Sequence, residues 1–149
     1  MPLYTVGRSN FTLSTSADSL TIVSSAYPLR IMVVDFKGLA TSSSANEILM
    51  YRGTTVGSTA LSGAITPSRL STGSAAAAFS AYSAFGSSTG STSGDVLWRF
   101  GVNGNGGQDK FVALPGAEIS MPSSGYMQFK ASIGAGSITG ALLIEELSG

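Results

Sequence analysis

A glycine-rich segment is the first part of this sequence whose residue types suggest chemistry. It spans Gly101–Gly107 and reads GVNGNGG. Glycine-rich turns cradle phosphate when they lead from a strand into the N-terminus of a helix. This one leads into Gln108–Val112, which has the pattern of another strand, and no Lys-Ser or Lys-Thr pair follows the glycines. Asn-Gly and Gly-Gly pairs permit the positive φ of a tight turn, so the sequence predicts a hairpin here and not a phosphate site.

The same segment offers oxygen atoms that a calcium ion could use, from Asn103, Asn105 and Asp109. Calcium takes six to eight oxygen ligands, usually with several carboxylates among them. The segment supplies one carboxylate and occurs in a single copy. We therefore predict no metal site and no cofactor.

The residue types that enzymes use most are missing or thinly spread. The chain has no His and no Cys, which removes the usual zinc ligands, the thiol nucleophile and the commonest general base. A serine nucleophile would need a lysine base, and none of the three lysines lies in a Ser-x-x-Lys pattern. A glycosidase needs two carboxylates facing each other across a cleft, and nothing in the sequence pairs them. The sequence predicts that the protein is not an enzyme and has no catalytic residue. The acidic residues, which we expect to be solvated or in salt bridges, are Asp18, Asp35, Glu47, Asp95, Asp109, Glu118, Glu145 and Glu146.

Trp98, the only tryptophan, could stack on a sugar ring together with tyrosines, as in lectins. It alternates in register with Val96 and Phe100. Residues two apart in a strand share a face, so this pattern favours a core position for Trp98. Sugar binding remains the alternative.

Length and composition limit the possible domain organisation and partners of the protein. A chain of 149 residues is the size of one domain. Only 11% of the residues are charged, and eight acidic residues balance eight basic ones. No net field attracts nucleic acid or an anionic membrane, so we expect neither as a partner. The longest apolar stretches, such as Ile31–Val34 and Ala141–Ile144, are far shorter than the roughly 20 residues that span a bilayer. Met1–Tyr4 lacks the pattern of a secretory signal.

The surface must be rich in uncharged Ser, Thr, Gly and Ala. Such a surface costs little to desolvate, and it suits burial against another subunit. A soluble monomer is the alternative that the same composition allows.

These residues have to be positioned by β-strands, because helical periodicity is almost absent. Apolar alternation and β-branched residues recur at the short spacing of an antiparallel sandwich. Leu29–Phe36 is apolar on both faces, which predicts a central strand. The other clear strands are Glu47–Arg52, Asp95–Val102, Lys110–Leu114, Tyr126–Ile133 and Ile138–Glu146.

Two regions are less clear. Tyr4–Val6, Phe11–Leu13 and Leu20–Val23 could be short strands or an extended arm over a neighbouring subunit. Ala75–Phe85 carries three aromatic residues among alanines and serines, and we interpret it as a strand followed by a loop over Gly86–Gly94. A helical turn through the four alanines is the alternative for this segment.

The pattern as a whole predicts an all-β fold, an antiparallel two-sheet sandwich of about eight to ten strands that resembles a jelly roll. An immunoglobulin-like sandwich is the next option. We expect residues 1–25 to form an N-terminal arm or edge strands, and residues 26–149 to form one β-sandwich domain.

Three segments in order, Gly94–Gly107, Leu114–Ile119 and Gly140–Glu146, resemble small virion proteins encoded near the head genes of tailed bacteriophages. Thr54–Pro67 fits the same pattern, and the likeness extends over residues 30 to 147. The resemblance implies a capsid cement or decoration protein. Such proteins are commonly β-sandwiches that trimerise and bind the outer shell.

The function expected from this resemblance is a virion structural protein on the capsid exterior, made in the host cytoplasm. It would form a homo-oligomer, a trimer, and bind the major capsid protein to stabilise the head shell. A fibre or baseplate module that binds a receptor or glycan is the alternative. Apolar anchors would form the interfaces, and the alternative is that these residues are ordinary core. The expected anchors are Tyr4, Phe11, Leu13, Phe79, Tyr82 and Phe85.

Overall fold

In the described part of the chain, the regular secondary structure consists of β-strands alone. The computed structural model describes residues 1–16, 19–53, 61–73, 75–85, 95–134 and 136–147. Within these ranges no helix is long and apolar enough to cross a membrane. The strands are β1 (Leu3–Thr12), β2 (Leu20–Val23), β3 (Leu29–Gly38), β4 (Ala45–Gly53), β5 (Leu61–Ile65), β6 (Ser68–Arg69), β7 (Ser80–Phe85), β8 (Asp95–Asn103), β9 (Gln108–Val112), β10 (Ile119–Met121), β11 (Tyr126–Ile133) and β12 (Ser137–Glu146).

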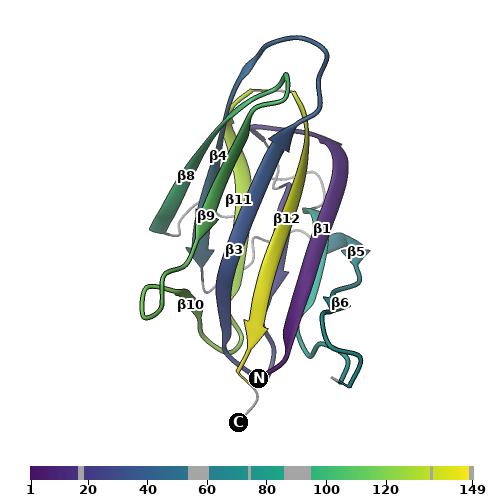
Figure 1. Ribbon diagram of the computed structural model, residues 1–149, viewed down its shortest axis with the longest axis vertical. Coiled ribbons are helices and arrows are strands. Elements are labelled where there is room, and N and C mark those ends of the chain that lie inside the picture. The colour runs from purple at the N-terminus through teal and green to yellow at the C-terminus, as the bar shows by residue number, and fades with distance from the viewer. Residues whose placement is uncertain (17–18, 54–60, 74, 86–94, 135, 148–149) are drawn as a thin grey trace.

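The strands form two antiparallel sheets that pack face to face (Figure 1). We name them sheet A, in the order β10-β3-β12-β1-β6 with β9 also paired to β3, and sheet B, in the order β5-β7-β2-β11-β4-β8. Eight of the strands form the central part of the sandwich, four in each sheet, in the orders β9-β3-β12-β1 and β8-β4-β11-β2. This is the strand order of a jelly roll, so the predicted all-β sandwich is confirmed.

The segment between β4 and β8 adds three strands to this eight-stranded plan. β5 and β7 extend sheet B beyond β2, and β6 extends sheet A beyond β1. All three therefore lie on one side of the sandwich, opposite the edge that β8 and β9 form. The sequence did not predict β5, β6 or β10, because they are short and have no clear alternation.

The N-terminal residues are strands of the two sheets and not an extended arm, and β1 lies near the edge of sheet A, where β6 pairs only with Tyr4 and Thr5. β1 lies inside sheet A between β12 and β6, and its pairing runs from Leu3 opposite Glu145 to Thr12 opposite Ser137. β2 lies inside sheet B between β11 and β7. The two predicted short strands at the N-terminus are one strand, β1, with a bulge between Arg8 and Phe11.

The core lies between the sheets and follows the predicted alternation. Ile138, Leu142 and Ile144 of β12 are buried, and so are the inward residues of β3 and β11. Phe36 is at the centre, in edge-to-face contact with Phe100 and with Phe129 at centroid distances of 5.1 and 5.7 Å. β3 is a central strand, as predicted, because both of its edges are paired.

The alanine-rich segment is a strand only in its second half. β7 begins at Ser80, and residues 75–79 are neither strand nor helix. The loop that the sequence predicts over residues 86–94 lies outside the described residues.

Candidate functional site

Four of the six predicted interface residues are in the core of this chain. Tyr4, Phe11, Leu13 and Phe79 are all at most 4% exposed. They pack inside the sandwich because their strands or turns face the opposite sheet, so the core alternative is confirmed for them. Tyr82 is half-buried on β7, and the side chain of Phe85 lies outside the described part of the structure.

Tyr4 joins β1 to the alanine-rich segment. Its ring contacts Phe79 edge to face, and its hydroxyl donates a hydrogen bond to the carbonyl oxygen of Ala75 at 3.0 Å. Burial raises the pKa of the Tyr4 hydroxyl above its ordinary value; the negative charge of Glu146 raises it further, and the positive charge of Arg69 opposes this. Tyr4 is thus a structural anchor within one chain.

Glu146 departs from the expectation that the acidic residues are solvated or in salt bridges. Its side chain is 4% exposed, and a carboxylate oxygen accepts the backbone N–H of Ala78 at 2.9 Å. Neighbouring Glu145 points to the opposite face of β12, where it lies 3.5 Å from Arg30. The predicted opposite orientation of the two glutamates is therefore confirmed, while their environments differ.

The glycine-rich segment forms the tight turn that the sequence predicts, but the two strands it joins are not paired with each other. β8 pairs with β4 in sheet B, and β9 pairs with β3 in sheet A. The turn is closed by a hydrogen bond from the N–H of Gly107 to the oxygen of Asn103 at 3.0 Å. It is therefore a corner between the sheets and not a paired hairpin.

Two of the three residues that suggested calcium, Asn103 and Asp109, already use their side-chain oxygens to accept backbone N–H groups. One carboxylate oxygen of Asp109 accepts the N–H of Gly101 and the other accepts the N–H of Lys110. The amide oxygen of Asn103 accepts the N–H of Asn105 at 2.9 Å. In the described ranges, no three His, Cys, Asp or Glu residues are grouped to hold a metal ion.

Trp98 is not a core residue, and here the sequence prediction is wrong. Trp98 is 43% exposed, whereas Phe100, two residues along on the same face, is fully buried. The reason is that β8 is the last strand of sheet B, and β9 leaves it to join sheet A. The inward face of Trp98 contacts Phe111, whose ring lies 5.1 Å from that of Trp98 in an edge-to-face arrangement.

A pocket of about 370 Å³ opens beside this ring pair. We call it the Trp98 pocket. It is apolar apart from one cation, and two of its wall residues are strongly exposed, Val112 at 56% and Leu114 at 71%. Pockets of this size, with aromatic and apolar walls and few polar groups, are the usual sites of small ligands. The lining residues are Trp98, Lys110, Phe111, Val112, Leu114 and Ala117.

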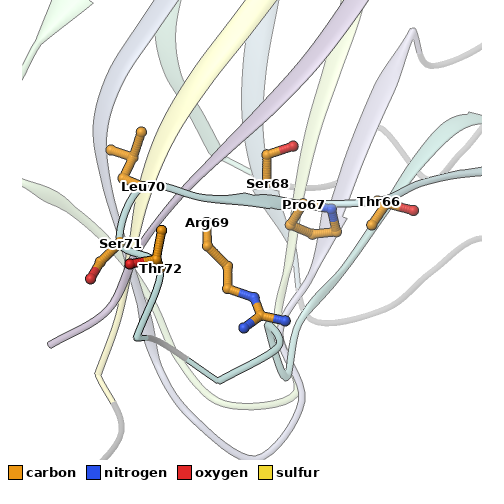
Figure 2. Close-up of a pocket in the computed structure, with 7 residues that line it drawn as sticks. All are labelled: Thr66, Pro67, Ser68, Arg69, Leu70, Ser71 and Thr72. Atoms are coloured by element: carbon orange, nitrogen blue, oxygen red, sulfur yellow. The ribbon is translucent and has the colours of Figure 1, made fainter.

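A second pocket, of about 520 Å³, is a groove formed by the consecutive residues Thr66 to Thr72 (Figure 2). Arg69, its one charged lining residue, extends to the opposite side of the strand from Ser68 and Leu70. Arg69 stands opposite Tyr4 in the pairing of β1 with β6, and its charge acts on the Tyr4 hydroxyl. The charge in this groove thus belongs to the packing around Tyr4.

The register places residues of the outer face of sheet A side by side. One row across four strands has Val112 opposite Val33, Val33 opposite Leu143, and Leu143 opposite Thr5. Their inward neighbours are buried, so these four side chains point outward. We call them the outer row. The sequence holds no separate signal for this row, because β3 and β12 are apolar on both faces.

Comparisons with protein-family models, with curated proteins and with solved structures find no match to this chain.

Proposed function

We propose that this protein is a structural protein of a virus particle, a decoration protein that binds the outside of a capsid shell and stabilises it. Its partners are the major capsid protein and two further copies of itself in a trimer. It acts on the capsid exterior after synthesis in the host cytoplasm, and it works by packing and not by catalysis.

The observation that carries this proposal is the outer row. Three of its four side chains are apolar, the row crosses four adjacent strands, and Val112 at one end is 56% exposed. Contiguous apolar side chains on a protein surface mark contact sites. Beside the row lie the small residues Gly7 and Ala141, opposite each other in the register. A flat surface of small and apolar side chains lets another β-face approach closely and costs little to desolvate.

Several of the polar and charged side chains around the outer row are engaged with one another. Arg30 and Glu145 pair with each other at 3.5 Å on one side of it. On the other side, the amide of Gln108 donates to both carboxylate oxygens of Asp35, at 2.8 and 2.9 Å. Burial of this surface would therefore leave the opposite charges of Asp35 and Lys110, which face each other in the register, as the main charges that a partner has to accommodate. Many copies of one modest contact are enough to stabilise a shell.

The resemblance of three sequence segments to phage decoration proteins and the jelly-roll sandwich support the same function. Fold alone does not identify a function, so this support is secondary to the surface.

The test is co-sedimentation of the purified protein with shells assembled from the major capsid protein, together with light scattering. We expect saturable binding and, in solution or on the shell, units of three times 15.1 kDa. Leu143→Glu should reduce shell binding at least tenfold, because it places a charge in the middle of the outer row. The matched control is Ile133→Glu, which adds the same charge at an exposed apolar residue of sheet B.

Equal binding by the two folded variants would refute the role of the outer row. Failure of the wild-type protein to sediment with shells would refute the function itself.

A further inference from the structure

The Trp98 pocket adjoins the outer row, with which it shares Val112, and its walls indicate a class of ligand. The indole ring is held in place by Phe111 and leaves nearly half of its surface open. Val112 and Leu114 form the exposed apolar wall beside it. A fixed, open aromatic ring loses little conformational freedom on binding, and it suits a ligand with a flat apolar face.

Lys110 gives the pocket a positive charge that is not neutralised by a described neighbour. The ion pairs among the described residues are Arg30–Glu145 and Arg99–Glu47, so neither includes Lys110. Asp35 stands opposite Lys110 in the register, yet its carboxylate is occupied by the Gln108 amide.

Asp109, the acidic residue next to Lys110 in the chain, uses its two carboxylate oxygens to accept the backbone N–H groups of Gly101 and Lys110. Glu118, beside the pocket, is also engaged with the backbone. Glu118 follows the lining residue Ala117, and the backbone N–H groups of Glu118 and Gly116 lower the pKa of its carboxyl group, with a smaller contribution from Arg30. The ammonium group of Lys110 is therefore available to an anionic group that enters the pocket.

The edge of β8 is protected against an extended polypeptide. The register of β4 and β8 shifts so that Leu97 is bulged between Trp98 and Val96. Bulges at sheet edges twist the strand away from a flat pairing geometry. Further along the same strand, the N–H of Gly101 is already taken by Asp109. A compact ligand that enters the pocket fits this edge better than a partner strand.

We propose that the Trp98 pocket binds a pyranose that carries a carboxylate, such as a uronic acid or a sialic acid at the end of a glycan. The C–H face of the sugar ring packs on the indole of Trp98 and on Leu114. The carboxylate pairs with the ammonium group of Lys110. A structural protein with this site also adheres to acidic glycans, which the outer row alone would not provide.

The single tryptophan of the chain makes the test direct, because all indole fluorescence comes from the pocket. The probes are glucuronic acid, N-acetylneuraminic acid and their neutral counterpart glucose, titrated into the intact protein. We expect a saturable change in Trp98 emission with the acidic sugars. Glucose should bind several-fold more weakly, and added salt should remove most of that difference.

Two matched pairs of variants separate the two contacts. Lys110→Gln should weaken binding of glucuronic acid about threefold to fivefold, as expected for an exposed ion pair, and leave binding of glucose unchanged. Lys37→Gln removes an exposed lysine from β3, outside the lining, and should change neither. Leu114→Ala should weaken all sugars, whereas Leu39→Ala at another exposed leucine should not.

No saturable emission change with either acidic sugar would overturn the proposal. Equal affinities of Lys110→Gln and Lys37→Gln for glucuronic acid would overturn the role of the carboxylate. A further arm titrates a short glutamate-rich peptide. If the peptide saturates the emission change and the sugars do not, the pocket binds acidic protein segments and the proposal is wrong. None of these results depends on shell binding, which the Leu143→Glu variant tests.

Discussion

Tyr4 and Phe79 pack edge to face inside the sandwich, with ring centroids 5.5 Å apart and ring planes at 82°. The two residues are 75 positions apart in a chain in which both were expected to contact other subunits. Their contact fixes the alanine-rich segment against the first strand. Substitutions at Tyr4 should therefore change the stability of the fold measurably.

Tyr4→Phe should lower the free energy of unfolding by about 1 kcal/mol, because it removes the hydrogen bond to the oxygen of Ala75 and keeps the ring contact. Urea denaturation measures the loss. The control is Tyr27→Phe, at an exposed tyrosine, which should leave the unfolding midpoint unchanged. Equal midpoints for wild type and Tyr4→Phe would mean that this hydrogen bond contributes nothing.

The raised pKa of Tyr4 predicts a loss of stability at alkaline pH. An unfolded tyrosine titrates near pH 10, whereas the buried hydroxyl of the folded protein holds its proton to higher pH. Above pH 10 the folded state thus binds more protons than the unfolded state, so stability falls as pH rises through the folded pKa. Below pH 10 this group contributes no slope. Thermal melting from pH 8 to 11 should show a steeper alkaline decline for wild type than for Tyr4→Phe.

Glu146→Gln should destabilise the protein by about 1–2 kcal/mol. The amide that replaces the carboxylate still offers an oxygen to the N–H of Ala78, but it loses the extra strength of an ionised acceptor. Glu145→Gln is the matched control. It affects only the partly exposed pair with Arg30 and should cost less than 1 kcal/mol. A smaller effect at position 146 than at position 145 would contradict the assignment.

Gly38→Ala should be among the most damaging single-methyl additions. A Cβ at position 38 would lie 2.1 Å from the backbone oxygen of Asn103 and 2.5 Å from that of Gly104, and backbone atoms cannot move aside cheaply. We expect a loss of at least about 1–3 kcal/mol, measured by chemical denaturation. Gly7→Ala is the control on β1, where the nearest atom would be 3.9 Å away, and it should be neutral or slightly stabilising.

Removal of residues 1–15 should unfold the protein and not merely weaken its binding to a shell. The deletion takes away β1, an interior strand of sheet A, together with the core side chains Tyr4, Val6, Phe11 and Leu13. Circular dichroism and the loss of a cooperative melt would show this. A truncated protein that melts like the wild type would mean that β1 is dispensable.

The strands with strong alternation could be predicted from sequence almost to the residue. Tyr126–Ile133 has the predicted bounds, and Leu29–Phe36 and Ile138–Glu146 differ from the structure by one or two residues. The spacing of apolar residues in each strand shows whether one face or both faces are buried, and this can be seen within the strand itself. The same holds for the turn at Gly101–Gly107, since positive φ selects glycine locally; Gly106 has φ of 73°.

The candidate site was not predictable in the same way. Alternation placed Trp98 on the inward face, and this orientation agrees with burial of Phe100. Burial also depends on how much of that face is covered, and Trp98 lies on the edge strand of sheet B, where Phe111 covers it only in part. Likewise, a short apolar strand such as Tyr4–Val6 has the same sequence pattern whether it packs in the core of its own chain or against another subunit. Whether a strand lies at the edge of a sheet depends on the order of the strands, and the residues of one strand do not reveal that order.

The pairing of β1 with β12 sets the order in which this chain can fold. β1 forms its longest pairing with β12, a strand far along the chain, with Leu3 opposite Glu145. β1 therefore keeps its apolar residues exposed until β12 is present. Such long-range pairing makes folding slow, and it exposes the unfinished fold to aggregation.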